Sequence, residues 1–302
     1  MTDLVIELTL AAVIISVTDG RPRMLTIRHD DANAIPSGPV SSTDTTLELA
    51  LRRWIRDQAG IDVGYVEQLY TFGDLARIGD QEPDGPRPVS IAYVALVREE
   101  SPAPRAEWVD CYQLLPWEDH RDGRPQAMAD VDNGLARWAS DDDERRRRVA
   151  IAFGQEPAPW DGVPVLERYE LLYEASLVVE AYRDRAKPAP ADTAGRAMRL
   201  DHRRMVATAL GRIRGKLTYR PVVFELLPSE FTLLELQDTV EALAGIRLHK
   251  QNFRRLVDRN RLVDGTGKRA TSTGGRPAEL FRFRPEVFLE RPRPGIGLPY
   301  RR

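Results

Sequence analysis

Residues 249–260 combine a helical spacing of apolar side chains with a polar and basic outer surface. Phe253, Leu256 and Val257 recur at three and four residues, which predicts a helix with one buried side. The remaining candidates for contact are His249, Lys250, Gln251, Asn252, Arg254, Arg255 and Arg259. Gln, Asn and Arg in the first turns of a helix suit base edges in the major groove, and flanking Arg and Lys suit phosphates. The chemistry that this segment indicates is the recognition of duplex DNA.

A preceding helix must position these side chains, and the sequence predicts one over about 232–244. Thr232 with Glu235 three residues later forms a capping box, and Phe231 is placed to pack on Leu236 as a hydrophobic staple. The buried stripe of this helix comprises Leu233, Leu236, Val240 and Leu243. Gly245 falls in the short turn before the next helix, which is typical of a helix-turn-helix.

A basic hairpin is expected after the second helix. Gly265 and Gly267 lie in a loop, and a strand is predicted over 279–283. We expect Lys268, Arg269 and Arg276 to contact DNA, with Arg276 entering a minor groove. The order of cap, turn, polar helix and basic hairpin indicates a winged helix-turn-helix. The alternative, a generic helical subdomain with a basic surface, does not predict this order.

The charge distribution divides the chain into two unlike parts. The net charge of −2 conceals 23 basic and 11 acidic residues over 195–302, a net of +12, so that residues 1–194 carry −14. A basic part beside an acidic part suggests that the basic one binds a polyanion. Ordinary solvated surface charge is the alternative explanation.

Composition excludes several other classes. With 42% hydrophobic and 30% charged residues the chain is not disordered, and its single cysteine, Cys111, excludes an internal disulfide framework and a cysteine-based zinc site. The apolar run 4–17 contains Glu7, is too short to span a membrane and lacks the basic start of a signal peptide, so we expect a cytoplasmic protein. The four histidines lack metal-ligand spacing: His29, His120, His202 and His249.

The N-terminal part is expected to be a mixed α/β domain. Strands are predicted over 4–17, 23–29, 65–72 and 89–97, and a helix over 46–58 that stops at Gly60. The run of acids at 141–144 followed by Arg145–Arg148 suits a short solvated helix, and 166–184 predicts one amphipathic helix. We expect a domain over 1–135, a helical connector and Pro/Ala linker over 136–195, the winged helix over 196–290 and an extended tail over 291–302.

The segment from Gly38 to Gly60 resembles a Nudix box, whose helical glutamates hold Mg²⁺ against a pyrophosphate. When the pattern is counted back from Gly60, Arg53 stands at the position of the conserved arginine and Trp54 at that of the first glutamate. Asp57 and Gln58 then stand at the positions of the glutamate pair. When the pattern is counted forward from Gly38, it is matched by Asp44, Arg52 and Arg53. Arg56 and Asp57 then stand at the positions of the glutamate pair. In either register at most one of three metal-binding carboxylates survives, so we expect a Nudix fold, an α/β/α sandwich with a mixed sheet, without hydrolase activity.

Three further stretches resemble the Nudix-related transcriptional regulators of NAD metabolism, the NrtR/NadQ-like group. They are Leu69–Arg77 with Arg87–Tyr93, Leu217–Pro228 running into Phe231–Gln237, and Asn252–Arg255 with Gly274–Ala278. The resemblance implies a repressor whose winged helix binds an operator near NAD biosynthesis or salvage genes. It also implies that the Nudix-like domain senses an adenine nucleotide, which would be ADP-ribose, NAD or ATP, and it implies no required cofactor or metal.

Six residues are candidates for the effector site. An arginine pair such as Arg77 and Arg87 suits a diphosphate through bidentate hydrogen bonds, Arg28 and Arg53 can face the same pocket, and Phe72 or Trp117 can stack an adenine. The opposite interpretation makes the aromatic residues core and the arginines surface.

A two-fold homodimer reading a palindromic operator, without membrane attachment, is the expected assembly. Two alternatives remain open at this point: an active nucleotide pyrophosphohydrolase with an accessory nucleic-acid-binding module, and an RNA-binding or scaffold protein.

Overall fold

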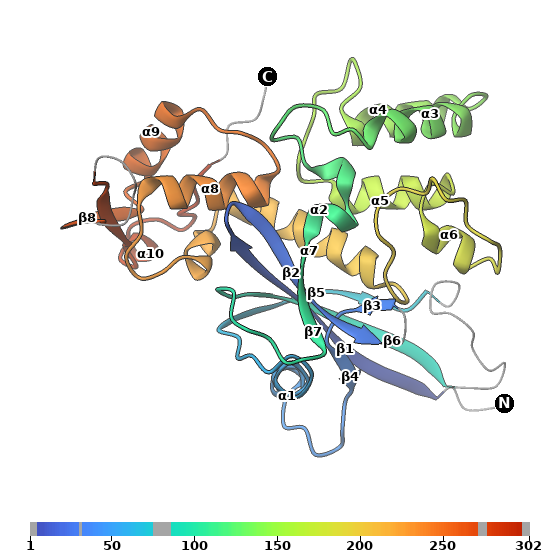
Figure 1. The fold of residues 1–302 in the computed structure, drawn as a ribbon, viewed down its shortest axis with the longest axis horizontal. Helices are drawn as coiled ribbons and strands as arrows, with labels where there is room; N and C mark the ends of the chain where they lie inside the picture. The colour runs from blue at the N-terminus through green and yellow to red at the C-terminus, as the bar shows by residue number, and fades with distance from the viewer. Residues whose placement is uncertain (1–4, 30–31, 75–85, 271–276, 298–302) are drawn as a thin grey trace.

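The structure is a computed structural model that describes residues 5–29, 32–74, 86–270 and 277–297. Arg77 and Arg276, two of the expected contact residues, lie outside these ranges. In the described part a mixed sheet lies between helix α1 (Leu47–Ala59) on one side and the C-terminal helices on the other (Figure 1). This arrangement is the α/β/α sandwich expected from the sequence.

Within the described residues the sheet has seven strands, in the order β3-β2-β1-β6-β5, with β4 paired to β1 and β7 paired to β2. The long central strands β1 and β6 run parallel, from Ile6 opposite Arg87 to Ile15 opposite Leu96, and the other pairs are antiparallel. The strand bounds are β1 Ile6–Thr18, β2 Arg21–His29, β3 Ala32–Ala34, β4 Ser37–Pro39, β5 Tyr65–Phe72, β6 Arg87–Leu96 and β7 Ala106–Asp110. The four strands expected from the sequence are confirmed, and β3, β4 and β7 are additional.

Strand β1 is apolar on both faces because each face meets a different set of helices. Successive side chains of a strand point to opposite faces. Leu10, Ala12 and Ile14 pack with the buried face of α1. Val13 and Ile15 join a second core that extends into the C-terminal helices. The unbroken apolar run therefore reflects a strand covered on both sides.

Residues 111–201 connect the sheet to the C-terminal helices, and every regular element of this connector is a helix. Its elements are α2 Cys111–Leu114, η2 Pro116–Glu118, α3 Met128–Trp138, α4 Asp143–Phe153, α5 Val165–Glu174 and α6 Val179–Arg183. The expected acid-before-base helix is α4, whose N-cap Asp142 accepts a hydrogen bond from Arg145 N.

The expected single helix over 166–184 is wrong, because the chain breaks between α5 and α6. Ser176 adopts a left-handed φ of 56° there, and Leu177 N bonds back to Leu172 O at 2.8 Å. The break lets the Leu177 side chain pack on Gly134 of α3, where any Cβ would collide with it. Tertiary packing has thus overridden a continuous amphipathic pattern.

The C-terminal part begins with α7, His202–Leu217, which lies across the sheet (Figure 1). Its further elements are η3 Val222–Leu226, α8 Leu233–Ala244, α9 Lys250–Asn260, β8 Val263–Arg269, β9 Glu279–Phe283 and α10 Val287–Glu290. The capping box of α8 is present as expected, with Thr232 and Glu235 bonded reciprocally. Strands β8 and β9 pair antiparallel and form the expected wing.

The second of these two cores joins the sheet to the winged helix. It contains Val13 and Val94 of the sheet together with Leu236 and Phe253 of the winged helix. The sequence analysis placed a helical connector between a domain over 1–135 and the winged helix over 196–290, whereas α7 and α8 cover the second face of the sheet directly. In the described part of the tail, Ile296 is buried and its N–H bonds Leu217 O at 3.0 Å.

Candidate nucleic-acid interface and effector domain

Helix α9 buries Phe253 and Val257 and exposes its polar side. The exposed residues include all seven expected contacts at its N-terminus and along its outer face: His249, Lys250, Gln251, Asn252, Arg254, Arg255 and Arg259. Within the described ranges, none of these seven side chains forms a hydrogen bond or an ion pair with another residue. A row of unneutralised Arg and Lys beside Gln and Asn is suited to phosphates and base edges together.

The turn before α9 is held by a polar network that the sequence analysis missed. Buried Glu241 accepts hydrogen bonds from Gln237 Nε2 at 2.8 Å and from Leu248 N at 2.9 Å through one oxygen. Its other oxygen accepts one from Arg247 at 2.9 Å. The network fixes where α9 starts. Its signal in the sequence is an acid four residues after Gln237 on a side otherwise apolar.

Gly245 ends α8 in the left-handed conformation, with φ 69°. A Cβ at this position would collide with the carbonyl oxygen of Glu118 and lie 2.6 Å from Arg214 Nη2. The glycine predicted from the helix-turn-helix pattern is therefore required for two reasons, the backbone conformation and the close approach of the connector.

The wing places some of the expected contacts at the surface. Lys268 and Arg269 of β8 are exposed, and Lys268 pairs with Glu230 at 2.8 Å. The base of the wing is anchored by the bridge between Phe231 and Phe281 and by the stack of Phe224 on Phe283 at 4.4 Å. Among the described residues Arg269 has no ion-pair partner, so of these two cations it is the one available to an anion.

Helix α7 carries a row of basic residues that are neutralised inside the protein. Arg214 Nη1 lies 2.5 Å from Glu118 Oε2, and Arg203 Nη2 lies 2.9 Å from Glu180 Oε2. Arg204 pairs with Glu170 at 2.5 Å. Part of the excess of basic residues over 195–302 therefore stabilises the contact with the acidic half and does not face a partner.

Glu118 is the centre of this buried charge cluster. Burial alone would raise the pKa of Glu118, but the guanidinium groups of Arg168 and Arg214 outweigh it and hold the pKa below its usual value. Arg168 binds it through two contacts, at 2.6 and 2.9 Å. The carboxylate stays charged and links η2, α5 and α7.

A second polar contact joins the sheet to α7 at its C-terminal end. Lys216 Nζ donates to Tyr65 Oη at 2.9 Å and to Glu67, and Arg212 pairs with Glu67 at 3.1 Å. Burial together with the hydrogen bond to Glu67 raises the pKa of Tyr65, which keeps it protonated. Strand β5 is therefore attached directly to the helix that leads into the winged helix.

Helix α1 uses the residues at Nudix-box positions for structural contacts. Trp54 packs on Gly38 and donates from Nε1 to Pro39 O at 3.0 Å. Gln58 makes two hydrogen bonds with the backbone of Ser37, at 2.9 and 2.8 Å. Asp57 is exposed. Helix α1 ends at Gly60, which adopts the left-handed conformation with φ 71°.

The structure does not bring together the five expected effector residues that it describes. Arg53 pairs with Asp44 at 3.0 Å beside Trp54, and Arg87 donates to Gly73 O at 3.1 Å. Phe72 and Trp117 are buried in the main core, so no ring face is open for an adenine. Arg77 lies outside the described residues. For the two aromatic residues the arrangement matches the alternative interpretation, in which they are core.

Arg28, one of the expected effector residues, lines a cavity. The cavity has a volume of about 340 Å³ and is bounded by Arg28, Pro104, Arg105, Ala106 and Glu107. Arg28 N donates to Arg105 O at 2.9 Å, which places the two residues side by side. Arg105 was missed by the sequence analysis because it precedes a strand too short to be predicted. Two arginines at one opening suit a phosphate-bearing ligand.

Within the ranges that the structure describes, no three or more His, Cys, Asp or Glu side chains are grouped so that they could hold a metal ion. The described helices also include none that is long and apolar enough to cross a membrane.

The fold and the exposed basic helix define a class of protein, an α/β/α sandwich of the Nudix type joined to a C-terminal winged helix. Residues 223–283 match a family model described as the NrtR DNA-binding winged helix domain. The match covers the helix-turn-helix and both strands of the wing.

Comparison with individual proteins supports this assignment. The chain is 36% identical over 83 residues to the ADPR responsive transcriptional repressor NtrR of Acinetobacter baylyi, which covers 28% of this chain and 33% of that protein. The match thus spans about one third of the length of this curated relative. Shewanella oneidensis NrtR complexed with a 27mer DNA has the same fold, with a TM-score of 0.57, 20% identity, and 93% and 94% of the two chains covered.

A MutT/nudix family protein from Enterococcus faecalis also shares the fold, with a TM-score of 0.54 and 14% identity over 92% of this chain and 86% of that protein. The N-terminal Nudix fold expected from the degenerate box is therefore confirmed, together with the C-terminal winged helix.

Proposed function

We propose that this chain is a transcriptional regulator that binds duplex DNA through α9 and the wing. The observation that carries the proposal is the exposed side of α9, where three arginines, a lysine, Gln251 and Asn252 are left without intramolecular partners in the described structure. A helix of this composition, held by a glycine turn and followed by a wing, suits the major groove. The similarity to a repressor and to a DNA-bound regulator supports the same function.

The effector of this regulator is an adenine nucleotide, and ADP-ribose is the first candidate. The curated relative is named for its response to ADP-ribose. Arg28 and Arg105 at the 340 Å³ cavity supply the cations that a diphosphate needs. NAD and ATP share this diphosphate chemistry and are the competing candidates.

The regulator acts as a repressor of NAD biosynthesis or salvage genes and works as a homodimer on a palindromic operator. The support for this part is the resemblance of the sequence motifs to the NrtR/NadQ-like regulators. A two-fold dimer presents two α9 helices to successive major grooves.

The Nudix-like domain senses a nucleotide and does not hydrolyse it. Hydrolysis by a Nudix box needs several carboxylates around Mg²⁺. In the register counted from Gly60, Trp54 is packed on Gly38 and Gln58 is bonded to the Ser37 backbone, so only Asp57 offers a carboxylate. An active pyrophosphohydrolase with an accessory DNA-binding module is the alternative.

Fluorescence anisotropy tests the regulator function directly. The full chain is titrated onto labelled DNA from upstream of the candidate target genes, and onto a shuffled duplex, with and without ADP-ribose. We expect specific binding that changes with ADP-ribose, because only a ligand with different affinity for the two DNA-binding states shifts the equilibrium. Equal affinity for both duplexes at all salt concentrations would contradict the proposal.

A further inference from the structure

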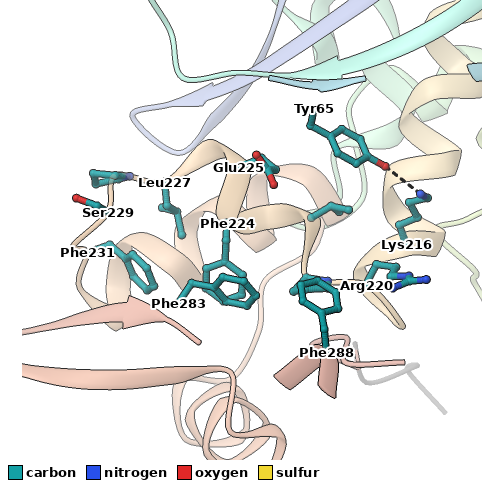
Figure 2. Close-up of a pocket in the computed structure, with 13 residues that line it drawn as sticks. Tyr65, Lys216, Arg220, Phe224, Glu225, Leu227, Ser229, Phe231, Phe283 and Phe288 are labelled. Atoms are coloured by element: carbon teal, nitrogen blue, oxygen red, sulfur yellow. Dashed lines mark hydrogen bonds between the residues drawn. The ribbon is translucent and has the colours of Figure 1, made fainter. Parts of the chain in front are cut away.

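A second cavity lies where the sheet, α7 and the winged helix meet. Its volume is about 520 Å³, and its walls come from β5, α7, η3, β9 and α10 (Figure 2). Cavities of roughly 300–1,000 Å³ at the junction of structural units, lined by apolar and aromatic side chains with a few polar groups, are the usual sites of small ligands. None of the residues assigned above to DNA or to the nucleotide effector lines this cavity.

The floor of the cavity is aromatic. Phe224 stacks on Phe283 with ring centroids 4.4 Å apart, and Phe288 meets Phe283 edge to face at 6.1 Å. Phe288 is 46% exposed, although it is a large apolar side chain beside other aromatic rings. Aromatic rings prefer offset-stacked or edge-to-face partners, so a planar ring is the group that this floor best accommodates.

Two cations lie at one end of the cavity. Arg220 is exposed, and its side chain has no partner among the described residues, while Lys216 points toward Tyr65 (Figure 2). The Lys216 ammonium has three hydrogens and uses two of them for Tyr65 and Glu67, so one remains. Because Glu67 already pairs with Lys216, the Arg220 guanidinium supplies the charge for a single carboxylate, which it can bind through two parallel hydrogen bonds. The remaining hydrogen of Lys216 is a further donor at the same end.

Exposed Glu225 also lines the cavity and limits what can enter. A second acidic group on the ligand would be repelled by this carboxylate, and so would a phosphate with its higher charge. The combination of an aromatic floor, two cations and one limiting acid therefore selects a monoanion with a flat ring.

We propose that this cavity binds a small aromatic monocarboxylate, with its ring on the phenylalanine floor and its carboxylate on Arg220 and Lys216. The site is separate from the Arg28 cavity, so the proposal goes beyond the regulator function and does not depend on the identity of the nucleotide effector. Since the walls belong to both the sheet and the winged helix, a bound acid contacts both parts at once.

Isothermal titration calorimetry of the full chain with benzoate tests the proposal. Nicotinate serves as a second aromatic acid, benzamide as the neutral isostere and isophthalate as the dicarboxylate. We expect saturable binding of benzoate and nicotinate, and at least tenfold weaker binding of benzamide and isophthalate. The titration extends to acid concentrations several times higher than a Kd of about 1 mM. If neither acid gives saturable heat over this range, the proposal is overturned.

Two variants locate the site, and a third serves as a control. Arg220→Gln should weaken benzoate binding about tenfold or more, because hydrogen bonds between charged groups are strong. Phe288→Ala should also weaken it, and Arg147→Gln on the remote helix α4 should leave it unchanged. Thermal melting of each ligand-free variant checks that it is folded, and both binding variants change exposed side chains. Equal benzoate affinity in Arg220→Gln and the wild-type chain would overturn the proposal.

Competition separates this site from the effector site. Saturating ADP-ribose should leave benzoate bound, and displacement of benzoate would overturn the assignment to a separate cavity. Failure of ADP-ribose to bind at all contradicts the proposed effector but leaves the result for benzoate intact.

Discussion

Arg168 and Glu118 form a bidentate ion pair, at 2.6 and 2.9 Å, with both side chains fully buried. Arg214 of α7 binds the same carboxylate, so one negative charge is shared by two arginines, one from α5 and one from α7. This cluster lies against the turn at Gly245. That turn follows α8, the first helix of the helix-turn-helix. This buried carboxylate therefore helps, together with the hydrophobic core, to hold the winged helix against the connector.

The first prediction is that Glu118→Gln strongly destabilises the chain. The substitution keeps the shape of the side chain but leaves Arg168 and Arg214 buried without a counter-charge, a change that costs roughly 3–5 kcal/mol in comparable sites. Urea unfolding at pH 7 measures the loss in the free energy of unfolding. Exposed Glu286→Gln is the matched control and should change it by less than about 0.5 kcal/mol. A loss of the same small size in Glu118→Gln would show that the ion pairs contribute little.

The second prediction concerns pH. Burial, together with Arg199 and Arg183, lowers the pKa of His202 to about 3, and its Nδ1 accepts a hydrogen bond from Ile35 N at 3.2 Å. Because the folded pKa lies below the ordinary value of 6.5, the stability from neutral His202 is fully present above pH 6.5. It is lost as the pH falls from 6.5 toward 3. The free energy of unfolding should thus decrease by a few kcal/mol between pH 7 and pH 4.5, to order of magnitude.

A variant identifies the histidine responsible. His202→Gln lacks the titrating group, so its stability should fall less steeply over the same pH range, even if it starts lower. Burial also lowers the pKa of His120, to about 4, so some pH dependence should remain. Parallel curves for the variant and the wild-type chain would show that His202 is not the group that titrates.

Local rules predicted the DNA-binding unit well. The Thr232–Glu235 capping box, the left-handed Gly245 and the buried Phe253 and Val257 follow from short-range patterns, and each is present in the structure. The strand β5, Tyr65–Phe72, was also predicted at its observed ends. These features depend on residues within one turn or one strand, where sequence spacing and spatial distance nearly coincide.

The parts that failed depend on distant partners. Arg214 and Glu118 are 96 residues apart, so no local pattern indicates that this arginine, which adds to the basic charge of the C-terminal part, is buried in an ion pair. The residue types of Trp117 and Phe72 do not distinguish an aromatic ring that stacks on a ligand from one that fills a core. The break at Ser176 interrupts a regular pattern because Leu177 packs on another helix. In each case tertiary contact decided what the local pattern left open.

The third prediction is that Arg254→Gln with Arg255→Gln weakens operator binding at least tenfold and flattens its salt dependence. Each lost phosphate contact reduces the slope of log K against log salt by about 0.9, so the double variant should lose up to about 2. Fluorescence anisotropy at several salt concentrations measures both quantities. Arg147→Gln, an exposed arginine in the Arg145–Arg148 run, is the control and should leave both unchanged. If Arg147→Gln weakened binding and the double variant did not, the DNA contact would lie on α4.

The fourth prediction is that the chain does not turn over ADP-ribose. With Trp54 and Gln58 engaged in structural contacts, AMP release in the presence of Mg²⁺ or Mn²⁺ should stay below about 1 s⁻¹, an ordinary enzyme rate. Chromatography of the nucleotide products measures it. Turnover above this rate that disappears in Asp57→Asn would establish the hydrolase alternative and assign its remaining carboxylate.

The fifth prediction is that Arg28 and Arg105 bind the charged part of the effector. Both line the cavity of about 340 Å³, and the backbone hydrogen bond of 2.9 Å between them holds their side chains at one opening. Arg28→Gln and Arg105→Gln should each weaken ADP-ribose binding at least tenfold, because each removes a charge-assisted hydrogen bond to phosphate. Calorimetry measures the affinity, and the same variants should bind operator DNA normally without the ligand. Arg21→Gln, at the other end of β2, is the matched control. If both cavity variants keep full affinity, the effector must bind elsewhere, and the arginines of α1 become the next residues to replace.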